Sequence, residues 1–329
     1  MLPPPPSQPK SLGPKSSASS PLLLRDLGEN ALLRRILPLL PPGRHVAVGP
    51  GDDCAVVRLP GSPTDLLYTT DAVIERRHFP AWRDCAPSGV TPAMIGRKAL
   101  ARTLSDIAAM GGTPLHALVD LVAPADLPVP FALGLFRGMR TLALQHAVGI
   151  IGGDTAEGPA LELHLTAVGT VPRRRAILRS GARPGDIIYV TDRLGASWRP
   201  GNKKHYTFLP RLAEGRFLLP WATSMMDLSD GLSTDLPRLL DDSHAGAALD
   251  FDAIPLSPAA RRTPDPLASA LTDGEDFELL FTIPAKKQPS FARAWRAAFP
   301  RLPATPIGRI LADPAARPLP PGGWQHFHS

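Results

Sequence analysis

The spacing of apolar residues along the chain predicts helices and strands in turn. Residues 22–40 have the apolar periodicity of a helix, and the Pro-Pro-Gly run at 41–43 ends it. Short apolar runs at residues 54–59 and 65–74 have the length and β-branched content of strands. The folded chain is therefore expected to begin with one helix followed by strands.

The most regular pattern predicts a helix that begins after Thr91. Thr91 and Pro92 are typical of an N-cap and a first turn, and apolar residues recur at helical spacing up to the Gly-Gly pair at 111–112. A second helix is expected over Phe131–His146. A buried strand at residues 148–151, ending at a glycine pair, is expected to follow it.

The pattern changes once more in the second half of the chain. Residues 161–171 alternate, with Leu161, Leu163 and Leu165 on one face, which predicts a strand with one face in solvent. An Arg-rich stretch punctuated by Gly and Pro follows, and beyond it the alternation of elements resumes. The elements expected there are a strand at 186–190, a helix at 231–240 and a strand at 277–283.

Two successive mixed patterns predict an α+β protein with two mixed α/β domains. The 329 residues are enough for two domains of ordinary size. We place the boundary near Val171, which gives an N-terminal domain at residues 22–171 and a C-terminal domain at 172–329. Residues 1–21 are rich in Pro, Ser and Lys, and we expect a disordered tail there.

Composition narrows the classes of function only slightly. Lys and Arg number 36 against 30 Asp and Glu, and the net charge of +6 favours anionic ligands such as phosphates without choosing among them. The chain has two cysteines, which excludes a disulfide framework or a cysteine-based zinc site. No apolar run is long enough to span a membrane and no secretory signal precedes the fold, so a cytoplasmic protein is expected.

The candidate chemistry lies in aspartates that stand beside Gly, Ser or Thr, most of them at the ends of apolar runs. They are Asp52, Asp53, Asp71, Asp106, Asp154, Asp227 and Asp230. A carboxylate at a strand end is held by a rigid element while its oxygens stay in a cleft. Such oxygen ligands suit Mg²⁺, which binds through a few carboxylates together with substrate phosphates.

A structural explanation stands beside the functional one for each site. Asp next to Gly, Ser or Thr is common in turns and caps, and Asp106 is spaced to form a surface ion pair with Lys98 and Arg102 on one helix. Seven such aspartates in one cleft would repel one another without cations, which favours divalent metal ions and a polyphosphate. The sequence has no P-loop, dinucleotide-binding or protein-kinase motif, so metal-assisted phosphoryl chemistry remains.

The ordered motifs of the chain resemble the thiamine-monophosphate kinase family, within the aminoimidazole-ribonucleotide-synthetase-like (PurM-like) superfamily. In chain order they are LGENALL, GDDCAVV, TTDAVIERRHF, GRKALARTLSDIAAMGGTP, IGGDT, LRSGARPGDIIYVT, MDLSDGLSTDL, TDGEDFELLFTIP and GWQHF. Together they cover nearly the whole expected fold. The chain departs from the family pattern in two places. The stretch at residues 193–226 is shorter than is usual in the family, and Thr103 stands where the family usually has Asn.

The resemblance implies PurM-N-like and PurM-C-like domains and ATP-dependent phosphorylation of thiamine phosphate to thiamine diphosphate. It also implies several Mg²⁺ ions per site, ATP as co-substrate, and a homodimer in which the N-terminal domains pair. The N-terminal domain would bind metal and ATP, and the C-terminal domain would complete the site. No nucleic acid or membrane partner is implied. The alternatives are another ATP-using enzyme of the superfamily or a catalytically silent nucleotide- or thiamine-binding relative.

The resemblance also carries roles to individual residues. The metal ligands would be Asp53, Thr69, Thr70, Asp71, Asp106, Asp154, Asp227 and Asp230, of which Asp71, Asp106 and Asp154 would be catalytic. The ATP contacts would be Gly153, Asp154, Arg179 and Ser229, and the thiamine contacts His78, Glu275 and Trp324. Because the acceptor phosphate is already ionised at neutral pH, no general base is required. From the residues alone, Trp324 is more typical of a packing anchor and His78 of a structural histidine.

Overall fold

The structure is a computed structural model that describes residues 22–41, 43–199, 201–320 and 322–323. These residues fall into two compact units, residues 22–40 and residues 41–323. The expected tail at residues 1–21 and the predicted site residue Trp324 lie outside the described residues. Among the residues that are described, no helix is both long enough and apolar enough to cross a membrane.

The first unit contains two short helices where the sequence predicts one. These are α1 (Leu24–Leu27) and α2 (Glu29–Ile36), and α2 continues into the 3₁₀ turn η1 (Leu37–Leu39). Gly28 has a φ of 73° and separates the two helices. The prediction of one helix is wrong because this left-handed backbone, which glycine adopts readily, interrupts the helical hydrogen bonding.

The second unit begins with a six-stranded sheet in the order β1-β2-β3-β6-β4-β5. The strands are β1 (Val46–Val48), β2 (Ala55–Val57), β3 (Thr64–Ile74), β4 (Thr113–Ala123), β5 (Gly149–Glu157) and β6 (Glu162–Pro172). β4 and β5 pair in parallel, and the other neighbours pair antiparallel. Burial alternates along β6, which confirms the prediction of a strand with one face in the core.

The fifth strand is longer than predicted because its glycines do not end it. β5 continues through the glycine pair to Glu157, and Gly153 has a φ of 149°. A Cβ at Gly153 would lie 1.9 Å from the carbonyl oxygen of Val119 on β4. Glycine is therefore required here by the close approach of two paired strands rather than by a chain reversal.

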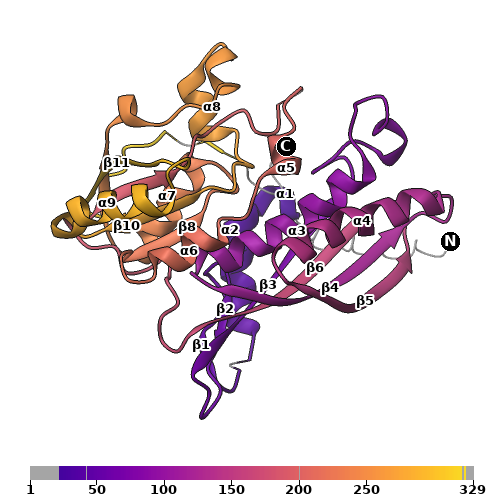
Figure 1. The fold of residues 1–329 in the computed structure, drawn as a ribbon, viewed down its shortest axis with the longest axis horizontal. Helices are drawn as coiled ribbons and strands as arrows, with labels where there is room; N and C mark the ends of the chain where they lie inside the picture. The colour runs from indigo at the N-terminus through magenta and orange to yellow at the C-terminus, as the bar shows by residue number, and fades with distance from the viewer. Residues whose placement is uncertain (1–21, 42, 200, 321, 324–329) are drawn as a thin grey trace, which may run out of the picture. The chain divides into compact units, whose positions relative to one another are not determined.

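Two helices cover one face of this sheet (Figure 1). They are α3 (Pro92–Ala109) and α4 (Val129–Gln145). The hydroxyl of Thr91 accepts a hydrogen bond from the backbone N–H of Met94 at 3.2 Å, which confirms the predicted cap. The apolar side of α3 packs in one core with Leu163 and Leu165 of β6.

The backbones of α3 and α4 touch at two glycines. A Cβ at Gly138 would lie 1.9 Å from the carbonyl oxygen of Ala93, and one at Gly96 would lie 1.9 Å from that of Leu135. Glycine therefore sets the separation of these helices. Neither neighbouring carbonyl is able to move without displacing its own helix.

Gly138→Ala is expected to lower the free energy of unfolding by about 2–3 kcal/mol, because the added methyl forces the helices apart. Urea denaturation monitored by circular dichroism measures this loss. Leu144→Ala is the control on the same helix, since that side chain is 66% exposed and its loss is expected to change stability by less than about 0.5 kcal/mol. Equal stability of the two variants would contradict the helix contact.

The rest of the second unit is built on a five-stranded antiparallel sheet in the order β8-β10-β7-β11-β9. Its strands are β7 (Ile187–Thr191), β8 (Ser224–Asp227), β9 (Gly246–Leu249), β10 (Leu279–Ile283) and β11 (Ala304–Leu311). The helices are α5 (Lys204–Thr207), α6 (Leu212–Leu218), α7 (Leu232–Asp242), α8 (Pro266–Thr272) and α9 (Gln288–Ala298). The 3₁₀ turns of the second unit are η2 (Trp82–Asp84), η3 (Phe251–Ala253), η4 (Ala260–Arg262) and η5 (Ala285–Lys287).

Both faces of this sheet are buried. Leu280 of β10 packs with Leu236 of α7 on one face, while Phe281 packs with Trp295 of α9 on the other. The last turns of α3 approach the second sheet, and a Cβ at Gly215 of α6 would lie 2.0 Å from the carbonyl oxygen of Ala108. This contact brings the end of α3 beside β8, where the candidate site lies.

Candidate functional site

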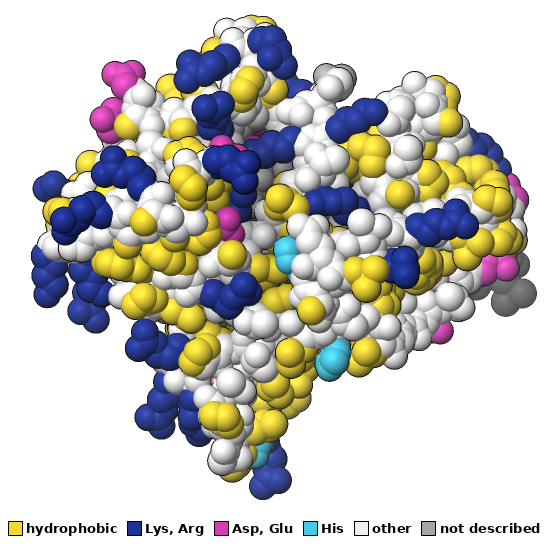
Figure 2. All heavy atoms as spheres, viewed as in Figure 1, with side chains coloured by type: hydrophobic (Ala, Val, Ile, Leu, Met, Phe, Trp, Pro, Cys, Tyr) yellow, Lys and Arg dark blue, Asp and Glu magenta, His cyan; other side chains and the backbone are white. Residues whose placement is uncertain are grey.

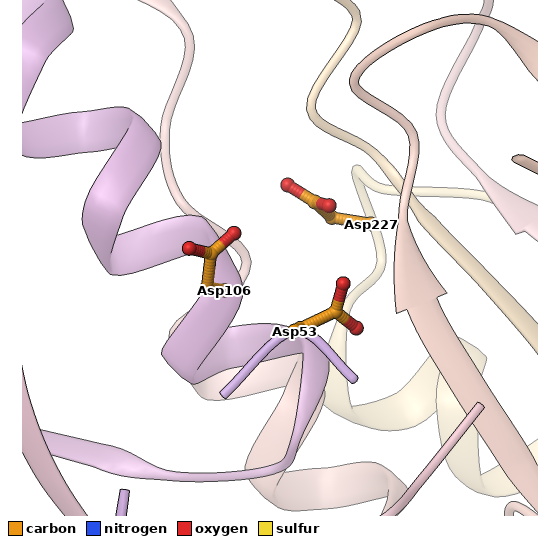
Figure 3. A group of neighbouring side chains, drawn as sticks. All are labelled: Asp53, Asp106 and Asp227. Atoms are coloured by element: carbon orange, nitrogen blue, oxygen red, sulfur yellow. The ribbon is translucent and has the colours of Figure 1, made fainter. Parts of the chain in front are cut away.

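Three aspartates from distant parts of the chain converge where α3 meets the second sheet. Asp53 lies in the loop before β2, Asp106 lies near the end of α3, and Asp227 is the last residue of β8 (Figure 3). One carboxylate oxygen from each lies within 4.8 Å of one from each of the other two. The structure thus brings together three of the predicted metal ligands from a loop, a helix and a strand that are far apart in the sequence.

Neighbouring side chains orient these carboxylates without neutralising all of them. Thr69 of β3 donates a hydrogen bond to Asp106, and Ser105 donates to Asp227 at 2.6 Å. Among the described residues, Asp53 alone of the three forms an ion pair, with Arg179. Its second oxygen, Oδ2, is buried and has no hydrogen-bond partner in the described part of the chain. The cluster therefore keeps both uncompensated negative charge and an unused oxygen.

Burial and mutual repulsion make these groups reluctant to ionise. Burial, and then the charge of Asp53, raise the pKa of Asp227 to about 7. The pKa of Asp106 is raised well above its usual range, mainly by burial and then by Asp227. Burial and the neighbouring Asp53 also raise the pKa of Asp52 to about 7. A bound cation would remove this penalty by pairing with the ionised forms.

The cluster fits a magnesium ion. Its donors are all carboxylate oxygens, which are the hard ligands that Mg²⁺ prefers, and three are enough because this ion keeps several waters. The unpaired Oδ2 of Asp53 is the kind of buried acceptor that a cation satisfies. Asp53, Asp106 and Asp227 would hold the ion.

Two other predicted metal ligands lie close by but are already paired with arginines. Asp71, on β3, forms an ion pair with Arg102 at 3.0 Å, and Asp230, after β8, pairs with Arg238 at 2.7 Å. Arg179, a predicted ATP contact, is held by Asp53 and donates through its backbone N–H to Asp52 at 3.1 Å. Arg179 therefore borders the acidic cluster, as a phosphate-binding residue there would.

The remaining predicted metal ligands lie on the opposite face of the six-stranded sheet. Thr69 faces α3, so Thr70, the next residue of the strand, points the other way and is exposed. Asp154 pairs in register with Asp120, is exposed, and shares that outer face. Gly153 precedes it on β5. Within one chain these three residues are not part of the aspartate cluster.

The two predicted thiamine contacts that the structure describes, His78 and Glu275, are joined by Lys98, which pairs with Glu275 and donates to the carbonyl oxygen of His78. His78 follows β3, and its Nδ1 accepts the backbone N–H of Ile74 at 2.9 Å. Glu275 lies before β10, has a φ of 58°, and donates its backbone N–H to the carbonyl oxygen of Ser229 at 2.7 Å. Ser229 thereby connects the predicted ATP and thiamine contacts.

The hypothesis that Lys98, Arg102 and Asp106 form a surface ion-pair row is wrong. Lys98 is fully buried, and Arg102 pairs with Asp71 and Glu275 rather than with Asp106. Tertiary packing of α3 overrides the local spacing, because all three residues point into the junction with the second sheet. Sequence reasoning missed Lys98 and Arg102 as site residues, although an Arg and a Lys within an otherwise apolar helix were a usable signal.

The surface differs in charge from this buried site. On the face shown in Figure 2, Lys and Arg side chains are widespread, while few Asp and Glu side chains are visible. This agrees with the net charge of +6 and with the burial of Asp53 and Asp227. A surface of this charge attracts anionic ligands.

Comparisons with known proteins agree with this architecture. Residues 51–171 match the family described as AIR synthase related protein, N-terminal domain. A solved structure of AaThiL complexed with AMPPCP and TMP superimposes with a TM-score of 0.79 at 27% identity, covering 94% of this chain and all of the other. These matches place the chain in the PurM-like class and confirm the predicted α+β fold.

The individual family follows from closer relatives. Thiamine-monophosphate kinase of Escherichia coli is 35% identical over 308 residues, which cover 87% of this chain and 91% of that protein. The thiamine-monophosphate kinase structure from Stenotrophomonas maltophilia is 31% identical, with a TM-score of 0.70 over 89% of this chain and 96% of that one. The chain belongs to the thiamine-monophosphate kinase family.

Proposed function

We propose that this chain transfers the γ-phosphate of ATP to thiamine phosphate and forms thiamine diphosphate. The observation that carries this conclusion is the near full-length match to thiamine-monophosphate kinases, in a chain whose aspartates converge on one site. The structure of AaThiL was solved in complex with AMPPCP and TMP. In-line transfer to a phosphate oxygen needs positioning and charge neutralisation more than covalent help.

Magnesium is the proposed metal. Bound at Asp53, Asp106 and Asp227, it would neutralise charge on the transferred phosphoryl group and bridge it to the protein. Asp71, Thr69, Thr70, Asp154 and Asp230 are proposed as further ligands. Arg179 lies at the edge of the cluster, and its buried Nε atom has no hydrogen-bond partner among the described residues, which supports its proposed contact with ATP. Gly153, Asp154 and Ser229 are the other proposed ATP contacts.

Thiamine is proposed to bind beside Glu275, with His78 and Trp324. Glu275 is a suitable partner for the cationic thiazolium because its carboxylate is ionised. Although burial raises its pKa, Lys98, His205 and Arg102 lower it below the usual range. No residue is required as a general base, since the attacking phosphate oxygen already carries a charge at neutral pH.

The chain is also proposed to act as a homodimer, with residues 22–171 as the pairing domain and 172–329 completing the site. The outer face of the six-stranded sheet supports this, because it exposes large apolar side chains. Tyr68 is 40% exposed, Leu118 is 41% exposed and Ile151 is 62% exposed. Pairing through this face would place Thr70 and Asp154 at the contact between the two copies.

Turnover of the purified full-length chain with ATP, MgCl₂ and thiamine phosphate tests the proposal. ADP release by a coupled assay and thiamine diphosphate by ³¹P NMR should rise together, and both should stop when EDTA is added. An active thiamine-monophosphate kinase serves as the positive control. Binding of both substrates without product, under conditions in which the control is active, would identify a catalytically silent relative instead.

A further inference from the structure

Arg102 joins the metal side of the site to the thiamine side. Its Nε lies 3.0 Å from Asp71 Oδ2 and its Nη2 lies 3.1 Å from Asp71 Oδ1, so it holds that carboxylate with two hydrogen bonds. Its Nη1 donates to Glu275 Oε1 at 3.2 Å. One guanidinium group therefore touches both a proposed metal ligand and a proposed thiamine contact.

We propose that Arg102 binds the phosphate group of the acceptor substrate and so selects thiamine phosphate over thiamine. This inference rests on the proposed function. In that reaction the acceptor phosphate would lie between the nucleotide, which the proposed metal ligands including Asp71 would help to hold, and the thiamine proposed beside Glu275. Arg102 occupies the position between those two carboxylates.

The guanidinium has donors left for such a phosphate. Arginine carries five N–H groups, and the three hydrogen bonds to Asp71 and Glu275 leave one N–H on each terminal nitrogen. These two N–H groups belong to a planar fork that suits phosphate oxygens. The side chain is 13% exposed, so part of it is open to a ligand.

The surroundings keep Arg102 charged and fixed in place. Although burial lowers its pKa, the carboxylates of Asp71 and Glu275 outweigh that effect and raise the pKa above the ordinary value. The guanidinium carbon lies over the ring of Phe277, 5.5 Å from the ring centroid. A fixed cation loses little conformational entropy on binding a phosphate, which favours selectivity.

Lys98 supplies a matched control one helical turn away. Its ammonium pairs with Oε2 of Glu275 and donates to the carbonyl oxygen of His78 at 3.0 Å. It also lies 3.0 Å from His205 Nδ1. No ion pair or hydrogen bond joins it to Asp71 among the residues that the structure describes. Lys98 is thus a positioning residue for the proposed thiamine contacts, whereas Arg102 also reaches the metal side.

The test compares thiamine phosphate and thiamine as ligands of wild type, Arg102→Met, Arg102→Lys and Lys98→Met. Calorimetry with MgCl₂ and a non-hydrolysable ATP analogue gives both dissociation constants. In Arg102→Met the preference for thiamine phosphate is expected to fall about 10- to 100-fold, as for loss of a charge-assisted hydrogen bond. Arg102→Lys should keep part of the preference. Lys98→Met should weaken both ligands by a similar factor and leave the preference unchanged.

Three outcomes separate this inference from the proposed function. Equal weakening of both ligands in Arg102→Met would show that Arg102 only positions Glu275, which overturns the inference while the function stands. A wild-type protein that neither binds thiamine phosphate nor releases ADP would refute the function and the inference with it. Thermal unfolding checks the fold of each variant. If Arg102→Met does not fold, an unchanged preference in Arg102→Lys, which lacks the fork, would overturn the inference.

Discussion

Asp106→Asn is expected to lower kcat about a thousandfold, because a metal-held charge supplies several kcal/mol of transition-state stabilisation. Asp106 lies in the carboxylate cluster with Asp53 and Asp227, and loss of one charged ligand leaves too little negative charge to hold a divalent ion. The amide oxygen of Asn is still able to accept the hydrogen bond from Thr69. The fold should therefore survive while turnover does not.

Steady-state ADP release at saturating substrates measures this change, and calorimetric titration with MgCl₂ plus the ATP analogue measures metal binding independently. Asp241→Asn is the control variant, because Asp241 is 69% exposed and its one ion pair within the described residues is a surface pair with Arg317. Its kcat should match wild type. Normal turnover and normal magnesium binding in Asp106→Asn would mean that the metal site lies elsewhere.

The fold was most predictable where the chain carries its own signals for the ends of elements. α3 begins after Thr91 and ends before Gly111 because capping and glycine act locally. β4 was missed because Pro114, His116 and Asp120 interrupt the apolar alternation that marks a strand. β10 begins two residues later than predicted, since Phe277 has a φ of 51° and is not extended. Such features depend on tertiary contacts.

The candidate site, too, was predictable where local sequence signals decide and not where tertiary contacts decide. Aspartates after apolar runs were visible in the sequence, and three of them converge because β8, α3 and the loop before β2 end at one junction. Strand alternation places Thr70 on the opposite side of the sheet from Thr69, which a list of motif residues does not reveal. The burial of Lys98 depends on α5 and on the loop that carries Glu275, both far away in the sequence. Local spacing could not predict it.

The metal-free protein is expected to lose stability as the pH rises from about 4 to 7, and magnesium should restore it. The pKa of Asp227 is raised from 3.8 to about 7, mainly by burial and then by Asp53. In this interval the folded state binds more protons than the unfolded state. The free energy of unfolding therefore falls as the pH rises. Full ionisation of Asp227 alone lowers it by about 4 kcal/mol.

Other groups change the stability in the opposite direction as the pH rises. A variant of Asp227 is therefore needed to identify its contribution. Burial lowers the pKa of His146 and His205, which makes the folded state gain stability as the pH rises through their range. Glu275, whose pKa is lowered from 4.5, changes the stability mainly below pH 4.5, which is below the two pH values that are compared. Asp227→Asn removes the titration of Asp227 and, because Asp227 raises the pKa of Asp106, weakens the same effect at Asp106, while the two histidines remain.

Urea denaturation in EDTA at pH 5 and pH 8 gives the unfolding free energies of wild type and Asp227→Asn. The variant should be the more stable of the two at pH 8, and the difference should shrink at pH 5, where Asp227 is protonated. Magnesium should stabilise wild type far more at pH 8 than at pH 5, because it binds the ionised carboxylates. Equal stabilisation at both pH values, or a variant as pH-dependent as wild type, would show that Asp227 does not titrate as the cluster geometry requires.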